Sequence, residues 1–351
     1  MIKDVEKYPK YISFLKENRT KEEALEIYKQ RISDSSEIYK KFSNSFLLRS
    51  CPICGSKKFK EIDKFNNEYG VARCTNCNSC YVNPAPNEEA LDYYYNNCQC
   101  NKTYSALLKK RSNKSNIIFS ERVSYVLGLI EELLLQKKEI KILEVGANSG
   151  GFLSQLLMAL RKKGVSNKVS LIGIDIDKAA VEDPISDDIE LYHSSAEHFA
   201  EKTKDSYDLI LHFELIEHLF DPFSFCCAIY KLLNLNGLMY FTTPNELGLD
   251  NQALTYNEFR PLAHGIFPPM HINSFTTQNV SHFLLRSNFS VREIKTPGNF
   301  DVDIVKEFSE GKNELSVIRE IEDEKILAII QNIIKSLGAS SHLSVLALKD
   351  S

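Results

Sequence analysis

The sequence predicts an α/β protein whose mostly parallel, seven-stranded sheet carries helices on both faces, with a small cysteine-rich ribbon before it. Two observations support this. From about residue 140 onward, apolar segments of strand length alternate with helix-like segments, which is typical of a parallel sheet covered on both sides. Before that region, two C-x2-C pairs are separated by nineteen residues, a spacing typical of a metal-binding ribbon.

The composition is that of an ordinary globular protein with no strong charge bias. The 351 residues are 43% hydrophobic and 26% charged, and the formal net charge is -4. This charge disfavours nucleic acid and anionic membrane surfaces as partners. No apolar run reaches the roughly 18 residues of a membrane span, and the N-terminus lacks the apolar core of a signal peptide. We therefore expect a cytoplasmic protein without membrane contact, whose cysteines stay reduced.

Changes in composition divide the chain into four expected regions. Residues 1–50 are polar and helix-like, and residues 51–84 form the cysteine-rich ribbon. Residues 85–116 are linker-like, and their tyrosine cluster is placed to pack either on the ribbon or as a lid over a neighbouring site. Residues 117–351 form the main domain, with an insertion at about 298–342 that contains one long helix.

Four cysteines of the ribbon have the spacing of a structural metal site. Cys51, Cys54, Cys74 and Cys77 form two tight pairs, and four thiolates in a reducing compartment suit tetrahedral zinc. A closed shell of four thiolates stabilises a fold and leaves no open position for a substrate. An iron–sulfur centre is the alternative, because Cys80 extends the run to "CTNCNSC".

The main domain contains the strand and helix pattern of a doubly covered sheet. The expected helices are 117–138, 151–164, 196–202, 222–237 and 276–289. The expected strands are 141–145, 169–175, 189–193, 207–213, 238–244, 290–296 and 343–349.

The loop after the first of these strands has the residues of a nucleotide-type site. Gly146 and Gly150 in "ILEVGANSGGF" let the backbone approach a ligand at the edge of the sheet. Glu144 ends the first strand, and Asp175 ends the second, where an acidic residue is placed to bind ribose hydroxyls. A dinucleotide site would favour a glycine where this sequence has Asn148.

These motifs together resemble the class I S-adenosylmethionine (SAM)-dependent methyltransferases. The resemblance covers about residues 117–296 and the last strand. It rests on "LEVGANSGGF", "GIDID", "YDLILHFELIEHLFDP", "LNLNGLMYFTTPN" and "FTTQNVSHFLLRSNF". It implies a Rossmann-like class I methyltransferase fold and the transfer of a methyl group from SAM.

The resemblance also implies which residues hold the cofactor. Glu144 and the backbone at Gly146 and Gly150 would hold the methionine end, and Asp175 the ribose. The family usually has a Gly-Asp-Ala run near adenine, and residues 194–196 take its place here. The remaining expected cofactor contacts are Asn148, Ile176, Ser195, Ala196 and His212, of which Asn148 and Ser195 depart from the family pattern.

The cysteine-rich ribbon makes the resemblance specific to a subgroup of these enzymes. The pattern "CxxCG…CxxC…YVNPAP" before such a domain resembles bacterial methyltransferases with a zinc-ribbon front end, many of them associated with sugar or surface-polysaccharide modification. This resemblance implies a carbohydrate-type small acceptor. Asp301 and Asp303 are candidates for binding its hydroxyls.

The segment "FELIEHL" presents acidic and basic side chains directly after the fourth strand of the domain. Glu214, Glu217 and His218 lie there, and His218 is a candidate general base for an acceptor hydroxyl. The alternative is that Glu217 and His218 only begin the next helix. The segment also resembles small-RNA 2′-O-methyltransferases that bind Mg²⁺ or Mn²⁺ through two glutamates and two histidines. His271, or less favourably His264, would complete that set.

We therefore predict a SAM-dependent methyltransferase that modifies a hydroxyl, or less favourably an amine, of a sugar, sugar nucleotide or polysaccharide precursor. A second hypothesis is methylation of RNA that is bound by the ribbon. The acidic charge balance disfavours it. A third is a non-catalytic interaction protein with a degenerate cofactor fold.

Overall fold

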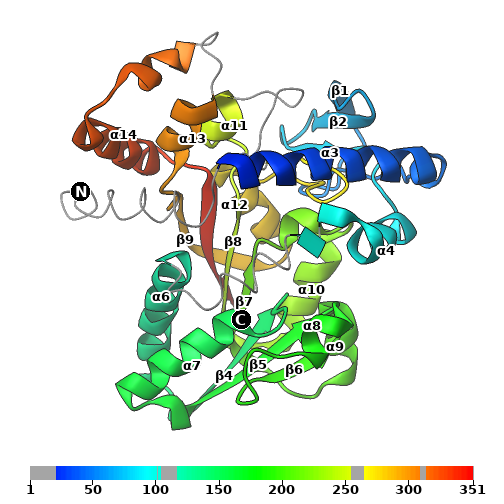
Figure 1. The fold of residues 1–351 in the computed structure, drawn as a ribbon. Helices are drawn as coiled ribbons and strands as arrows, with labels where there is room; N and C mark the ends of the chain where they lie inside the picture. Colours follow the sequence, from blue (N-terminus) through cyan, green and yellow to red (C-terminus); the bar gives the residue numbers. More distant parts are fainter. Residues whose placement is uncertain (1–20, 101, 104–116, 254–264, 309–313, 351) are drawn as a thin grey trace.

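The computed structural model describes residues 21–100, 102–103, 117–253, 265–308 and 314–350. His264 lies outside these residues. The described chain forms a seven-stranded sheet with helices on both faces and a separate three-stranded sheet (Figure 1). None of the described helices is long and apolar enough to span a membrane.

The large sheet has the order β6-β5-β4-β7-β8-β10-β9. Strands β4 to β8 run parallel to one another, and β10 runs antiparallel to both β8 and β9. The predicted fold class is confirmed. The strands are β4 (Ile140–Val145), β5 (Val169–Asp175), β6 (Glu190–His193), β7 (Tyr207–Phe213), β8 (Leu233–Pro244), β9 (Phe289–Lys295) and β10 (His342–Lys349).

Helices cover both faces because the strands alternate their apolar side chains. In β7, Leu209 and Leu211 belong to the core beneath α6 and α7, whereas Ile210 belongs to the core beneath α9, α10 and α12. The helices of this domain are α6 (Ile117–Leu134), α7 (Gly151–Lys163), α8 (Lys178–Glu182), α9 (Ala196–Lys202), α10 (Pro222–Leu232), α11 (Leu249–Ala253) and α12 (Thr277–Arg286).

One predicted helix boundary was wrong. The expected helix over 222–237 ends at Leu232, and β8 begins at Leu233. Leu233 pairs with Tyr207 of β7, so the pairing of β8 with its neighbour begins earlier than its apolar pattern indicated.

The histidine of β7 belongs to the core, which corrects its assignment as a cofactor contact. The His212 side chain is 0% exposed and stacks on Phe241 with 4.6 Å between ring centroids, and its edge meets Phe225. Burial alone lowers the pKa of His212 to about 3. The alternation of β7 places this side chain on the same face as Ile210, so it is not available to a ligand.

The buried imidazole should make stability depend on pH. His212 binds a proton in the unfolded chain below its ordinary pKa near 6.5 but stays neutral in the folded chain down to about 3. Stability is therefore lost as pH falls through this window. Between pH 6 and 5 the free energy of unfolding of wild type should fall more steeply than that of His212→Leu, by about 1.4 kcal/mol per pH unit. Equal slopes in urea titrations of the two proteins would contradict this.

In its described residues, the insertion at about 298–342 contains one longer helix, α14, and a shorter one, α13, which the sequence did not predict. Its elements are α13 (Asp301–Phe308), the 3₁₀ helix η4 (Glu314–Glu320) and α14 (Glu324–Ser336), which share a small apolar core. Asp301 is 0% exposed and accepts hydrogen bonds from Gln331 and Ser340. It ties α13 to α14, which corrects its candidacy as a sugar-binding residue.

The ribbon is a three-stranded antiparallel sheet between two helices. Its strands are β1 (Phe59–Phe65), β2 (Tyr69–Cys74) and β3 (Cys80–Val82). Helix α3 (Lys21–Phe42), followed by the 3₁₀ helix η1 (Ser43–Ser45), precedes it, and α4 (Glu88–Asn97) follows it. The Tyr69 hydroxyl donates to the Ser35 carbonyl at 2.7 Å, which joins β2 to α3. Figure 1 shows these elements together, apart from α6 and α7.

Candidate functional site

The loop between β4 and α7 has a conformation that only certain residues adopt. Gly146, Asn148 and Gly150 have φ angles of 77, 50 and 80°. These values lie in the left-handed region, which glycine adopts freely and asparagine more readily than most other residues. Asn148 therefore meets the same backbone requirement as the glycine that the family pattern favours.

A buried carboxylate lies at the start of this loop. Glu144 is 4% exposed, and its Oε2 has no hydrogen-bond partner among the described residues. Burial raises the pKa of Glu144 well above its usual range, and the positive charge of Arg122 opposes that rise. A buried acceptor without a partner is suited to a cationic or hydrogen-bond-donating ligand.

The carboxylate at the end of β5 holds the loop in place. Asp175 Oδ2 accepts from the Asn148 backbone nitrogen at 2.7 Å, and Oδ1 accepts from the Asp177 nitrogen at 2.8 Å. A carboxylate has about four acceptor sites, so capacity remains for two ligand hydroxyls. Ile176, which follows it, is 65% exposed and offers an apolar surface beside them.

The serine at the start of α9 caps the helix. Ser195 accepts a hydrogen bond from the His198 nitrogen at 3.2 Å, and Ala196 is buried as the first residue of the helix. Serine and aspartate are comparably good caps, so this departure from the family pattern preserves the local backbone. The Ser194 nitrogen donates to the Asp175 carbonyl, which keeps this segment beside β5.

Replacing Asp175 by asparagine should weaken SAM binding by about tenfold to a hundredfold, because the amide cannot accept from two hydroxyls as a carboxylate does. Calorimetric titration of SAM checks this, with the exposed Asp187→Asn as the matched control. An affinity within twofold of wild type would remove Asp175 from the cofactor site.

A second group of side chains lies after the end of β7 and beside β8. Glu217 and His218 lie on the 3₁₀ helix η3 (Ile216–His218), and His271 comes from the segment 265–275. Glu217 Oε1 lies 3.7 Å from His218 Nε2 and 4.0 Å from His271 Nε2. The three ligand atoms lie within 4.8 Å of one another, which is compatible with a shared proton or a shared cation.

Burial controls the charge of this group. Glu217 is 1% exposed, and its Oε2 accepts from the Thr243 hydroxyl at 2.8 Å, while Oε1 has no hydrogen-bond partner among the described residues. Burial raises the pKa of Glu217 well above its usual range. Burial also lowers the pKa of His218 to about 4, so its imidazole is neutral near pH 7 and able to accept a proton or bind a metal.

The structure does not bring Glu214 into this group, which corrects the four-ligand hypothesis. Its backbone is left-handed, with a φ of 49°, and its Oε1 accepts from Arg122 Nη2 at 2.8 Å and from the Thr242 hydroxyl at 2.7 Å. Its Oε2 lies 3.5 Å from His342 Nε2. Glu214 thus joins β8, α6 and β10, and three of the four predicted ligands remain together.

The sequence analysis did not single out two residues that lie beside the site. Arg122 of α6 pairs with Glu214 and lies near enough to Glu144 to affect its pKa, but a single arginine on an amphipathic helix carries no sequence signal. Tyr95 of α4 places its hydroxyl 3.2 Å from His218 Nδ1. The tyrosine cluster gave a signal for a lid, and Tyr95 is the member that reaches the histidine.

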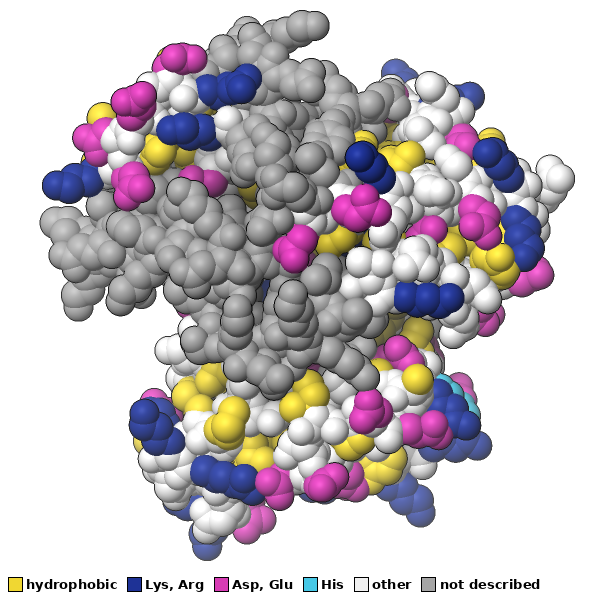
Figure 2. Space-filling view, viewed as in Figure 1, with side chains coloured by type: hydrophobic (Ala, Val, Ile, Leu, Met, Phe, Trp, Pro, Cys, Tyr) yellow, Lys and Arg dark blue, Asp and Glu magenta, His cyan; other side chains and the backbone are white. Residues whose placement is uncertain are grey.

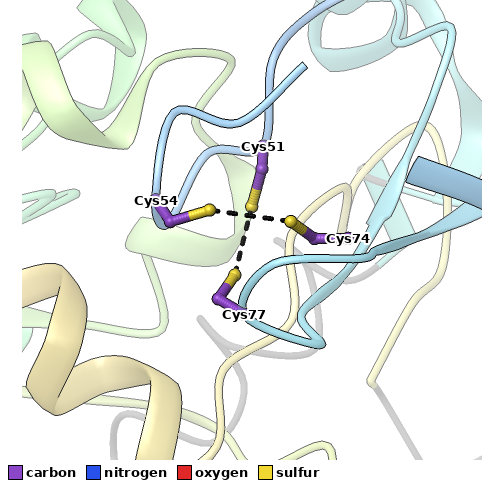
Figure 3. Close-up of side chains that lie close together, drawn as sticks. All are labelled: Cys51, Cys54, Cys74 and Cys77. Carbon is purple, nitrogen blue, oxygen red and sulfur yellow. Dashed lines mark hydrogen bonds between the residues drawn. The ribbon is translucent and has the colours of Figure 1, made fainter. Parts of the chain in front are cut away.

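The four predicted ribbon cysteines come together. Figure 3 shows their sulfurs pointing toward one centre, and all four lie within 4.8 Å of one another. The sulfurs of Cys51 and Cys77 are 3.5 Å apart, and those of Cys54 and Cys74 are 3.6 Å apart. Tetrahedral zinc with bonds of about 2.3 Å separates its sulfurs by about 3.8 Å, so the thiolates fit this ion. Cys80 lies in β3, outside this cluster.

The two cysteine pairs have the same backbone turn. The residue after each pair is left-handed: Gly55 has a φ of 74° and Asn78 one of 61°. Its nitrogen donates to the carbonyl of the first cysteine of its pair, Cys51 or Cys74. Glycine adopts this conformation freely at the first pair, and asparagine supplies it at the second.

Comparison with known proteins identifies the larger domain. Residues 119–294 match the family model described as a methyltransferase domain. The chain belongs to this methyltransferase family. The match spans the strands from β4 to β8, the cofactor loop and the segment that carries His218 and His271.

Curated relatives match a shorter segment. Over 114 residues, the chain is 34% identical to the ubiquinone biosynthesis O-methyltransferase of Pseudomonas savastanoi pv. phaseolicola, covering 30% of this chain and 45% of that protein. It is 29% identical over 133 residues to the protein of the same name from Aliivibrio fischeri, covering 36% and 51%. The chain thus spans about half the length of the curated relatives it matches.

Solved methyltransferase structures show distant similarity. The plantazolicin methyltransferase BamL, in complex with a triazolic desmethylPZN analog and SAH, has a TM-score of 0.48 and 14% identity, covering 74% of this chain and 94% of that one. A SAM-dependent methyltransferase from Archaeoglobus fulgidus has a TM-score of 0.42 and 17% identity, covering 70% and 100%.

Proposed function

We propose that this protein transfers the methyl group of SAM to a hydroxyl of a small acceptor. The observation that carries the proposal is the unpartnered, buried Glu144 at a left-handed loop that Asp175 holds in place. Membership of the methyltransferase family supports the reaction class. The curated relatives are O-methyltransferases by name, which supports oxygen as the acceptor atom.

The residues present fit the cofactor. Glu144 and the backbone at Gly146 and Gly150 would hold its methionine end, and the Asp175 carboxylate would accept from the ribose hydroxyls. The exposed Ile176 would cover the adenine. When bound, SAM supplies an already activated methyl group, so the chain has to orient the acceptor and take its proton.

The neutral His218 is suited to take that proton. Its Nδ1 faces the Tyr95 hydroxyl at 3.2 Å, and Tyr95 is 41% exposed, so an acceptor hydroxyl that displaces or joins Tyr95 reaches the same nitrogen. Glu217, next to Nε2, would stabilise the imidazolium that forms. In this arrangement Tyr95 selects the acceptor and His218 carries the proton.

A divalent cation is a second candidate for the same side chains. Glu217 Oε1 has no hydrogen-bond partner among the described residues, and it faces Nε2 of both His218 and His271. One carboxylate and two imidazoles suit Mn²⁺ better than Mg²⁺, which prefers oxygen ligands. Such an ion would lower the pKa of an acceptor hydroxyl.

We propose a carbohydrate-type molecule as the acceptor, with RNA as the alternative. On the face in Figure 2, lysine and arginine side chains alternate with aspartate and glutamate over α3 and the ribbon, without the single-sign field that nucleic-acid binding requires. The net charge of -4 agrees with that distribution. Support for a sugar comes from the resemblance of the ribbon segment.

Transfer of labelled methyl from SAM tests this function. The full chain is incubated with a small-metabolite extract and, separately, with total RNA, each after chelation and after adding back Mg²⁺ or Mn²⁺. We expect label in the metabolite pool, in a compound that glycosidase or phosphatase treatment identifies as sugar-linked. Label confined to RNA would overturn the proposal. Restoration by metal alone would assign the Glu217 group to a cation, and indifference to metal would assign His218 as the base.

A further inference from the structure

We propose that Arg49, which lies outside every predicted site, is the positioning residue that sets the distance between His218 and His271. The inference rests on the proposed function of those histidines. Arg49 precedes the first cysteine pair by two residues, so it belongs to the ribbon side of the molecule. Its guanidinium reaches across to the segments that carry both histidines.

Three backbone carbonyls accept hydrogen bonds from this guanidinium. Nη1 donates to Phe220 at 2.9 Å, Nη2 donates to Ile272 at 2.7 Å, and Nε donates to Val82 at 3.3 Å. Phe220 follows His218 by two residues, and Ile272 directly follows His271. One rigid, planar group therefore contacts β3 and the two histidine segments at the same time.

The Ile272 peptide is bonded on both sides. Its nitrogen donates to the Glu217 carbonyl at 3.0 Å, while its oxygen accepts from the Val82 nitrogen at 2.9 Å as well as from Arg49. The next residue, Asn273, also donates to the Glu217 carbonyl. The position of His271 beside Glu217 therefore depends on these direct bonds, on those from the Asn273 side chain to the Ile216 and Leu219 carbonyls, and on the contacts of the Ile272 carbonyl with the ribbon strand and Arg49.

Aromatic rings hold the guanidinium in its plane. Its central carbon lies 5.6 Å from the ring centroids of both Tyr81 and Phe220. The backbone nitrogen of Arg49 donates to Asn83 Oδ1 at 3.0 Å, which anchors the other end of the residue. A lysine would keep the charge but would lose the fork that separates the two carbonyls.

The test compares Arg49→Lys with Arg286→Lys in the full chain. Arg286 is a matched control because its guanidinium also joins the ribbon to the larger domain, donating to the Ile53 carbonyl at 3.0 Å and lying 4.0 Å from the Phe223 ring. It contacts neither histidine segment. A second variant, Arg49→Gln, is used if the lysine variant does not fold.

Four readouts are compared: zinc content, SAM affinity by calorimetry, the kcat of methyl transfer, and the ¹⁵N signals of His218 and His271 at pH 7, assigned with single histidine variants. For Arg49→Lys we expect unchanged zinc, SAM affinity within about twofold, and both histidine signals displaced. Where wild type transfers label, kcat should fall by about tenfold to a hundredfold, since an error of about 1 Å has effects of this size. Arg286→Lys should change neither the signals nor kcat.

Unchanged histidine signals in Arg49→Lys would overturn the proposal. So would a parallel loss of zinc or SAM affinity, because the residue would then support the fold in general. If wild type itself transfers no label, the proposed function fails, while the histidine signals still decide the role of Arg49.

Discussion

Replacing Glu217 by glutamine is expected to reduce methyl transfer by at least about a hundredfold while SAM affinity stays within about twofold of wild type. Glutamine fits the same space and keeps a contact with the Thr243 hydroxyl. It removes the carboxyl group that can become charged when His218 is protonated or a cation binds, so it can neither stabilise a protonated His218 nor bind a cation as a carboxylate does. Label transfer and calorimetric titration of SAM measure the two quantities separately.

The exposed Glu139→Gln is the control for this substitution. Retention of more than half of wild-type activity in Glu217→Gln would contradict the account. The histidines then separate the two mechanisms. Equal losses in Glu217→Gln and His271→Gln favour a shared cation, whereas large losses in Glu217→Gln and His218→Gln with little loss in His271→Gln favour direct proton transfer.

Replacing Cys54 by serine is expected to abolish binding of the zinc ion that the four thiolates fit, and to lower the free energy of unfolding by more than about 4 kcal/mol. The ribbon sheet has three short strands in the described part of the chain, and the cysteine cluster joins its two turns, so losing the metal would remove the link between them. Elemental analysis measures the zinc, and denaturant unfolding measures the stability.

The same variant should also lose methyl transfer, because β3 is bonded to the histidine segment. The Val82 nitrogen donates to Ile272, and the Ser274 nitrogen donates to the Cys80 carbonyl. Cys227→Ser is the control, since Cys227 lies outside the cluster of four cysteines. A Cys54→Ser protein with wild-type stability and no zinc would show that the metal has no structural role.

Local sequence patterns predicted the helices and strands, and also the sites whose residues lie close together in the sequence. Strands β5 and β7 have the predicted bounds because their apolar runs are bounded by polar residues. The cysteine pairs and the cofactor loop were also recognisable, because each function requires a fixed short spacing. The left-handed angle at Asn148 gives a physical reason for the departure that the sequence raised there.

Contacts between segments that are far apart in the chain could not be predicted from the sequence. His212 and Asp301 resemble functional polar residues in sequence, but strand alternation and the α13–α14 contact bury both. Arg49 contacts Phe220 and Ile272, which are 171 and 223 residues away along the chain. Such contacts depend on how the ribbon packs against the larger domain. The hydrophobic periodicity within either segment does not predict this packing.

Calorimetric titration of S-adenosylhomocysteine into the full chain tests the central claim most directly, because it requires neither the acceptor nor catalysis. We expect saturable binding at one site per chain, weakened by about tenfold or more in Asp175→Asn. Absence of binding to a folded, zinc-loaded protein would contradict the account and favour a non-catalytic interaction protein.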